Sequence, residues 1–222
     1  MKSEGHAVLP WGYSLDLRAS RLYFRMPVVI SMLRGVNVVG RHKIKMDVLR
    51  ALYVSLKLEN PRTFIQSGNV IFCTKEKNLS TLAKKIQAAI EGAFGFRPEV
   101  MLRTLDELRN SIAATPFPAH RALDPSKVLV TFLATDPCPE AGTTLLNFKH
   151  HPEELHIKGR ELYIYFPTGM GQSKLRWSAV EKLLKAPGTA RNWNSVTKML
   201  AIAEELEAAE AKVGKSRKKA RS

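Results

Sequence analysis

The stretch LRGVNVVGRHKIK, from Leu33 to Lys45, has residue types suited to binding an anion. Its glycines can bend the backbone, and Arg34 and Lys43 are two of its four cationic side chains. The stretch joins an apolar run to a predicted helix, and the start of a helix exposes backbone N–H groups that favour negative charge. Asn37 adds a side-chain amide. The alternative is a solvated basic turn whose glycines only shape the connection.

A second candidate is TGMGQSKL, from Thr168 to Leu175, which follows a predicted strand and leads into a predicted helix. Ser173 is a natural N-cap, and Lys174 could contact a phosphate. The segment lacks the GxxxxGK[ST] spacing of a P-loop. It is not a complete GxGxxG either, because Lys174 stands where the third glycine would be. A loop followed by a helix cap is the alternative.

A third candidate is TARNWNSV, which places Arg191, Asn192 and Asn194 around Trp193. A tryptophan beside arginine and asparagine can stack on a base while the polar groups hold a phosphate. The structural alternative is that Trp193 fills a domain interface and one of the asparagines caps the last helix.

The segment QSGN separates two apolar runs. Turn chemistry accounts for Gly68 and favours Asn69, but it does not require Ser67 or Gln66. This leaves room for a polar site at a sheet end, for which Ser67 and Asn69 are candidates.

No metal, cofactor or reaction class is predicted. The segment HHPEELH, from His150 to His156, suggests metal ligands but matches no helical ligand spacing such as HExxH. No GxSxG elbow and no kinase signature is present. If the protein is an enzyme, Ser67, Asn69 or Ser173 would lie near the chemistry.

Composition indicates an ordinary globular protein that is rich in positive charge. The 222 residues are 45% hydrophobic and 25% charged, with a net charge of +15. The segment Lys212–Ser222 holds six basic residues and no acidic one, which favours weak, salt-sensitive attraction to nucleic acid or anionic lipid. The alternative is a disordered tail that only adds solubility. No run approaches the roughly 18 apolar residues of a membrane span, and the N-terminus lacks the apolar core of a signal peptide. We therefore expect a cytoplasmic protein with free thiols at Cys73 and Cys138.

Hydrophobic spacing predicts the order β-α-β-β-α-β in the first half. The strands are expected over Val28–Val36, Thr63–Gln66, Asn69–Cys73 and within RPEVMLRT. The helices are expected from Met46 and over the apolar face that ends at Gly95. This is the ferredoxin-like order, an antiparallel sheet with two helices on one face.

The second half repeats this logic loosely. A strand KVLVTFLAT, a short helix over Pro139–Leu146 and a hairpin about Gly159 are expected, followed by helices from about Lys174 and Asn192. We find no matching residues between the halves, so duplication is an architectural expectation. The fold class is α+β with two ferredoxin-like subdomains. The expected division is a poorly ordered extension (1–25), a first subdomain (26–104), a connecting helix and loop (105–126), a second subdomain (127–210) and a disordered basic tail (211–222).

Four segments together carry a resemblance to a known family. MLRGVNVVGRHKIKMDVLR, TFIQSGNVIF, YFPTGMGQSKL and TARNWNSVTKML resemble, in this order, the bacterial domain of unknown function 1697 family. The resemblance covers about Met26 to about Glu207 and implies a ferredoxin-like duplication without an assigned activity. The family usually has Asn-Val-Gly-Gly where this chain has Asn37-Val38-Val39-Gly40, and valine does not readily adopt positive φ.

Three functional classes follow from these segments. The first is a module that binds an anionic small molecule, nucleotide or nucleic acid in one basic cleft, where the three loop segments converge. The second is an enzyme acting on a phosphorylated or nucleotide substrate. The third is a protein-interaction or structural module without a small ligand. The sequence leaves the oligomeric state open.

Overall fold

The computed structural model describes residues 26–219, apart from Val39, Arg41, residues 118–122, Gly142, Thr144 and residues 146–151, and it describes side chains only as far as Lys212. The predicted N-terminal extension, the histidines at 150 and 151 and part of the helix predicted over residues 139–146 therefore lie outside the described residues.

The first half forms a four-stranded antiparallel sheet in the order β2-β3-β1-β4, which is the ferredoxin-like order. β1 is buried at all six positions because both of its faces are covered, which explains why its sequence is apolar without alternation. The elements are β1 (Val28–Leu33), α1 (Met46–Ser55), β2 (Glu59–Phe64), β3 (Asn69–Cys73), α2 (Leu79–Phe94) and β4 (Val100–Thr104).

Two strands in this half have other bounds than predicted. β1 ends at Leu33 and not at Val36, because the chain turns at Gly35, whose φ is 69°. β2 spans Glu59–Phe64 and not Thr63–Gln66, and its pairing with β3 is shifted by an irregularity between Glu59 and Arg62. A bulge of this kind is typical of an edge strand.

The second half repeats the arrangement in the order β6-β7-β5-β8, again fully antiparallel. The predicted α+β class with two ferredoxin-like units is therefore confirmed. The elements are α3 (Leu105–Ala113), η2 (Pro125–Lys127), β5 (Val128–Leu133), β6 (Glu154–Lys158), β7 (Glu161–Tyr165), η3 (Met170–Gln172), α5 (Trp177–Leu184), β8 (Gly188–Asn192) and α6 (Trp193–Lys219).

The end of the second half differs most from the prediction. The strand β8 was not predicted, because Gly, Ala, Arg and Asn are weak strand formers and its pairing with β5 decides its conformation. α5 begins at Trp177, so Ser173 is not its N-cap. α6 continues to Lys219, into the stretch expected to be a disordered tail.

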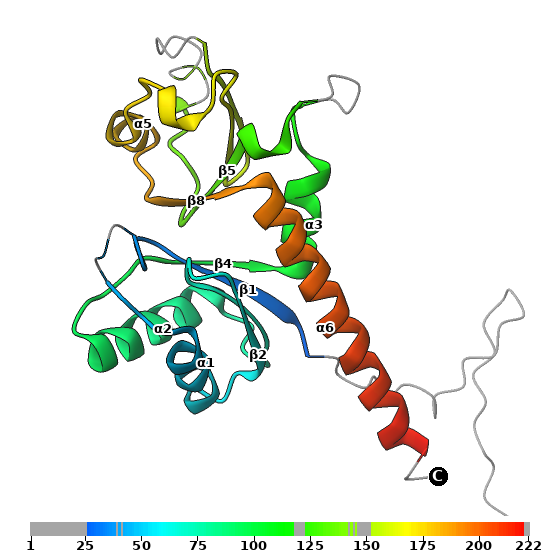
Figure 1. The fold of residues 1–222 in the computed structure, drawn as a ribbon. Helices are drawn as coiled ribbons and strands as arrows, with labels where there is room; N and C mark the ends of the chain where they lie inside the picture. Colours follow the sequence, from blue (N-terminus) through cyan, green and yellow to red (C-terminus); the bar gives the residue numbers. More distant parts are fainter. Residues whose placement is uncertain are drawn as a thin grey trace, which may run out of the picture.

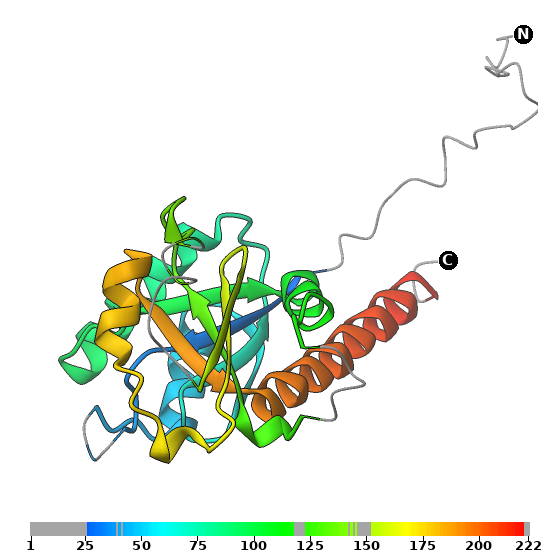
Figure 2. The ribbon, with the colours of Figure 1, turned by 90° about the horizontal axis from the view of Figure 1, so that it is seen from above.

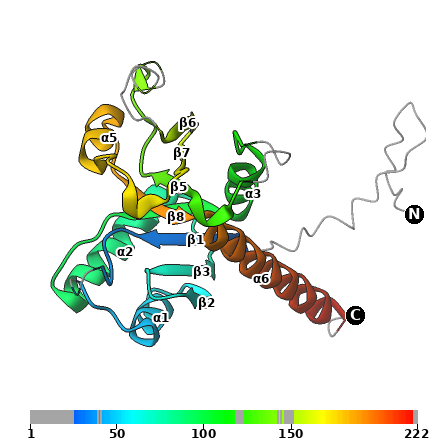
Figure 3. The same ribbon diagram turned by 45° about the horizontal axis from the view of Figure 1, so that its top comes forward.

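The two sheets face one another and their outer faces carry helices (Figure 1). The core between the sheets contains side chains of β1, β5 and β7 together with side chains of α3 and α6. A second cluster lies between the first sheet and α1 and α2, and a third lies between the second sheet and α5. Figure 2 and Figure 3 show α6 leading away from the junction of the two sheets. Among the described helices, none has the length and apolar character needed to cross a membrane.

Candidate functional site

The loop between β1 and α1 leaves the first sheet beside the second half of the molecule. The backbone N–H of Arg34 donates to the carbonyl of Glu99 at 2.9 Å. The guanidinium of Arg34 forms two bonds with the carboxylate of Glu181 on α5, at 2.8 and 3.0 Å. Because the guanidinium of Arg34 is paired with this carboxylate, the structural role of Arg34 is to tie the start of the loop to α5.

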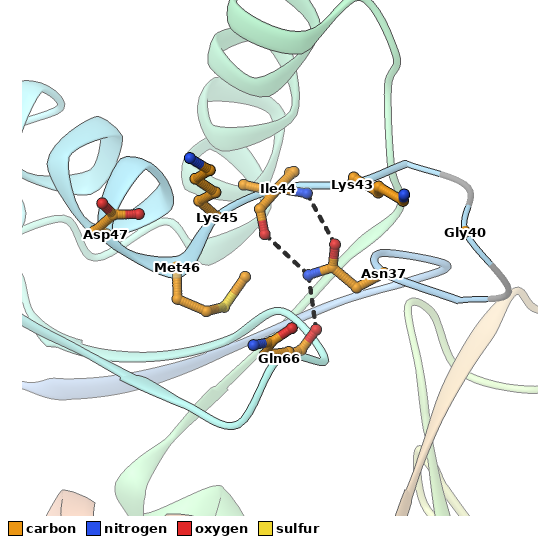
Figure 4. Close-up of a pocket in the computed structure, with 8 residues that line it drawn as sticks. All are labelled: Asn37, Gly40, Lys43, Ile44, Lys45, Met46, Asp47 and Gln66. Atoms are coloured by element: carbon orange, nitrogen blue, oxygen red, sulfur yellow. Dashed lines mark hydrogen bonds between the residues drawn. The ribbon is translucent and has the colours of Figure 1, made fainter.

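Asn37 holds the two arms of the loop together. Its side-chain oxygen accepts from the N–H of Ile44 at 2.9 Å, and its amide nitrogen donates to the carbonyls of Ile44 and Gln66 at 3.0 and 2.8 Å (Figure 4). Its φ of 56° lies in the left-handed region, which asparagine tolerates better than most residues. Because these bonds use both N–H groups of the amide, Asn37 has no side-chain donor left for a ligand, and its role is to shape the site.

A cavity of ≈ 720 Å³, here called the loop pocket, opens between this loop, the start of α1 and the β2–β3 turn. Met46 and Gln66 face one another across it (Figure 4). Lys43 and Lys45 are exposed on either side of the buried Ile44. The lining residues are Asn37, Gly40, Lys43, Ile44, Lys45, Met46, Asp47 and Gln66.

The start of α1 adds unpaired donors to the loop pocket. Lys45 is the N-cap and its side chain makes no capping bond. The carboxylate of Asp47 accepts from the N–H of Val48 at 2.9 Å, which satisfies one of the first N–H groups of the helix. The pocket thus combines two lysines and a helix N-terminus with one carboxylate, an arrangement that favours an anion.

Arg191 lies in a buried network beside the loop and does not line the loop pocket. Its Nε donates to the side-chain oxygen of Asn69 at 2.6 Å. Its Nη2 donates to the carbonyls of Leu33 and Ser67, both at 2.9 Å, and its Nη1 donates to Thr189 Oγ1 and to a backbone carbonyl, both at 2.8 Å. These bonds use all five N–H groups of the guanidinium. Arg191 therefore joins β8 to the ends of β1 and β3.

Burial lowers the pKa of Arg191 to about 10, because its bonded acceptors are neutral and removal from water disfavours the cation. The predicted residues Ser67 and Asn69 belong to the same network. The Asn69 amide donates to Ser67 Oγ at 2.8 Å and to the carbonyl of Phe64 at 3.3 Å. The β2–β3 turn, which carries Gln66 into the loop pocket, is thus positioned by Arg191.

The remaining predicted residues lie away from the loop pocket. Ser173 is bonded to the carboxylate of Glu153 and accepts from the N–H of Leu175 at 3.0 Å. Lys174 is exposed and is not among the pocket residues. Asn192 caps α6, since its side chain accepts from the N–H of Ser195 at 2.8 Å. Only Asn37 and Lys43 of the predicted set therefore line the pocket.

A second buried arginine, Arg103, mirrors Arg191 and was not predicted from the sequence. Arg103 pairs with Ile30 in β1, and Arg191 pairs with Val130 in β5, so each lies at the same register of the last strand of its half. Arg103 donates to Glu161 at 2.8 Å and to the carbonyl of Leu133 at 2.9 Å. An isolated arginine inside the apolar run VMLRT was the available signal, because a charge there must find a partner when the strand is buried.

The mirror relation extends to the acceptors. Leu33 ends β1 as Leu133 ends β5, and Asn69 begins β3 as Glu161 begins β7. Each arginine thus reaches the same two places in the opposite half. The halves do share matching residues at these positions, which the sequence alone did not reveal.

A family model described as a protein of unknown function, DUF1697, matches residues 26–163. The chain belongs to the DUF1697 family. Its fold is also similar to that of a conserved bacterial protein from Streptococcus pneumoniae, with a TM-score of 0.60 and 22% sequence identity over 80% of this chain and 99% of that chain. No curated protein matches the sequence. The DUF1697 assignment agrees with the resemblance drawn from the four motifs and carries no activity with it.

Proposed function

We propose that this DUF1697 protein binds an anionic ligand of the nucleotide class in the loop pocket. The observation that carries the proposal is the placement of the exposed Lys43 and Lys45 beside the start of α1, whose N-cap side chain makes no capping bond. Free N–H groups at a helix start and nearby ammonium groups together form a recurrent site for phosphate.

The size and lining of the loop pocket support a ligand larger than an inorganic anion. Its ≈ 720 Å³ falls within the range of roughly 300–1,000 Å³ that small-molecule and cofactor sites occupy. Met46 offers an apolar surface, and the Gln66 side chain, which lies opposite, can both donate and accept a hydrogen bond. A phosphate at the lysines would leave the base or sugar near Met46 and Gln66.

The backbone conformations of the loop and of the β2–β3 turn support a preorganised site. Asn37, His42 and Ile65 have φ values of 56°, 50° and 48°, and such left-handed conformations are costly for a β-branched residue such as isoleucine. Asn37 and His42 lie in the loop and Ile65 lies in the β2–β3 turn, and these two segments form walls of the pocket. Binding would then need little rearrangement of either wall.

Calorimetric titration of the full chain with AMP, ATP and a short single-stranded RNA tests the proposal. We expect binding of the phosphorylated compounds, and we expect the double variant Lys43→Gln/Lys45→Gln to weaken it by about tenfold or more, because two charge-assisted contacts are lost. The control is Lys198→Gln/Lys212→Gln, which removes the same charge from exposed positions on α6. This control should leave nucleotide affinity unchanged.

Two results would contradict the proposal. One is the absence of binding by any mononucleotide. The other is RNA binding that survives the loop substitutions and disappears when residues 212–222 are deleted, since that result would assign the affinity to the basic end of the chain.

A further inference from the structure

A second cavity, here called the hairpin pocket, lies between α3 and the turn that joins β6 to β7. Its volume is ≈ 330 Å³. Arg103 and Glu161 line it from the two sheets, Asn110 lines it from α3, and Lys158 and Arg160 line it from the turn. None of these residues lines the loop pocket, so the two cavities are separate.

The most buried residue that lines the hairpin pocket is Arg103, which is only 1% exposed. Its Nε donates to Glu161, its Nη1 to the carbonyl of Leu102 at 2.9 Å, and its Nη2 to the carbonyls of Leu133 and Arg160 at 2.9 and 3.2 Å. These four bonds leave one N–H of the five on a guanidinium, and it belongs to Nη1. Arg191, in the mirror position, keeps none.

The carboxylates around the hairpin pocket are largely occupied by protein donors. Glu107 accepts from Arg160 at 2.6 Å with one oxygen and from the N–H of Thr104 at 2.7 Å with the other. Glu161 holds Arg103 with Oε1, and its Oε2 lies beside Gly159 in the turn. Lys158 is exposed at the rim. The pocket therefore offers cationic donors and one carboxylate oxygen, Oε2 of Glu161.

The hairpin pocket is hollow because its helix carries small side chains there. Thr104 and Asn192 are the N-caps of α3 and α6. When positions are counted from these caps, Ser111 corresponds to Met199, and Ala114 corresponds to Ile202. Met199 is fully buried in the core between the sheets, and Ile202 packs against that core.

The corresponding residues Ser111 and Ala114 leave space for a ligand in the second half. Both line the hairpin pocket, whereas the larger Met199 lies in the core between the sheets and Ile202 packs against it. The difference between the two halves is therefore one of side-chain volume at two matched positions.

We propose that the hairpin pocket binds a small organic acid that carries a hydroxyl or amino group next to its carboxylate. The carboxylate would accept from the remaining Nη1 N–H of Arg103 and from Lys158, and the neighbouring group would donate to Oε2 of Glu161. A ligand with both features would pair its carboxylate with Arg103 and Lys158 and its hydroxyl or amino group with Glu161, all of which line the pocket. An anion without such a donor group would face the carboxylate of Glu161 with no hydrogen bond to it.

The test follows the backbone amides of Gly159 and Arg160 by NMR while the full chain is titrated with lactate, alanine, acetate and inorganic phosphate. We expect lactate and alanine to shift these resonances with affinities about fivefold or more above that of acetate, because an added buried hydrogen bond to a charged group favours them. Lys158→Gln should weaken lactate binding by about fivefold, as one charge-assisted contact is lost.

The decisive variant fills the cavity without removing any polar group. Ala114→Ile should abolish lactate binding, and Ala113→Ile is its control, because the neighbouring Ala113 is exposed as Ala114 is but does not line the hairpin pocket. Equal affinity for all four probes would overturn the proposal, and so would lactate binding that survives Ala114→Ile. The absence of any shift at the highest probe concentration would overturn it too.

Discussion

Two buried arginines join the halves of the molecule, one through a carboxylate and the other through neutral acceptors. Arg103 has Glu161 as its ionic partner, whereas Arg191 relies on Asn69 and backbone carbonyls. Desolvation lowers the pKa of both groups, and in Arg103 it outweighs the opposing effect of Glu161. Since a buried cation is retained only when most of its N–H groups are bonded, the two networks account for both buried charges, and the full set of five bonds at Arg191 explains why it is not a surface ligand group.

At the residue scale, Cys73 should make stability depend on alkaline pH. Burial, with a smaller effect of Glu210, raises the pKa of this thiol to about 12, whereas an unfolded cysteine titrates near about 8.5. Between these values the unfolded chain has released a proton that the native state keeps, so the free energy of unfolding falls as pH rises, by up to about 1.4 kcal/mol per pH unit.

Urea unfolding of wild type and Cys73→Ala under reducing conditions from pH 7 to pH 10.5 measures this effect. Substitution of Cys73 also removes its packing in the core, which adds a constant difference between the two curves. The difference should shrink above pH 8.5 because the variant lacks the titrating thiol. Parallel curves across the whole range would refute the assignment to Cys73.

At the element scale, β8 depends on a close approach that only glycine permits. A Cβ at Gly188 would lie 2.7 Å from Thr131 Cγ2 and 3.0 Å from Leu133 Cδ2. Gly188→Ala should therefore destabilise the protein by about 1–3 kcal/mol, as overpacking in a filled core does. The matched control is Gly92→Ala in α2, where nothing lies within 4 Å, and there alanine should be neutral or stabilising by up to about 1 kcal/mol. Equal denaturant midpoints for both variants would contradict this account of β8.

Elements with strong periodicity were predictable from the sequence, and elements determined by pairing were not. α2 follows its apolar face from the Asn78 cap to the left-handed Gly95, both local signals. β8 has no such signal, because its conformation comes from hydrogen bonds to β5. The same distinction between local and long-range signals applies to the residues of the candidate site. Lys43 and Asn37 line the pocket near their own helix start, whereas the position of Arg191 depends on a neighbour more than 100 residues away in the chain.

At the scale of the whole molecule, the two ferredoxin-like halves share a core and are therefore expected to unfold together. Val28, Ile30 and Met32 of the first sheet lie in one apolar cluster with Val130 and Phe132 of the second. Separation of the halves would expose this cluster and break both arginine networks. Burial of a common core of this kind favours a single cooperative transition over independent domains.

Scanning calorimetry tests this expectation and measures the contribution of Arg191. The calorimetric and van't Hoff enthalpies should agree within error for the wild type. Arg191→Met leaves the acceptors at Leu33, Ser67 and Asn69 without their donor. Each buried acceptor left unsatisfied costs about 1–3 kcal/mol, so the total loss should be at least about 3 kcal/mol. At about 2–4 °C per kcal/mol for a chain of this size, the single transition should move down by at least about 6 °C.

The control for this measurement is Arg34→Gln, which breaks a bond between the same two halves. Arg34 is 37% exposed and its partner Glu181 is 21% exposed, so solvent screens the pair and its loss should cost no more than about 1 kcal/mol. Its transition should therefore fall by a few degrees at most and keep its shape. Two resolved transitions in the wild type would show that the halves unfold independently. An Arg191→Met shift as small as that of Arg34→Gln would show that the buried network does not hold the halves together.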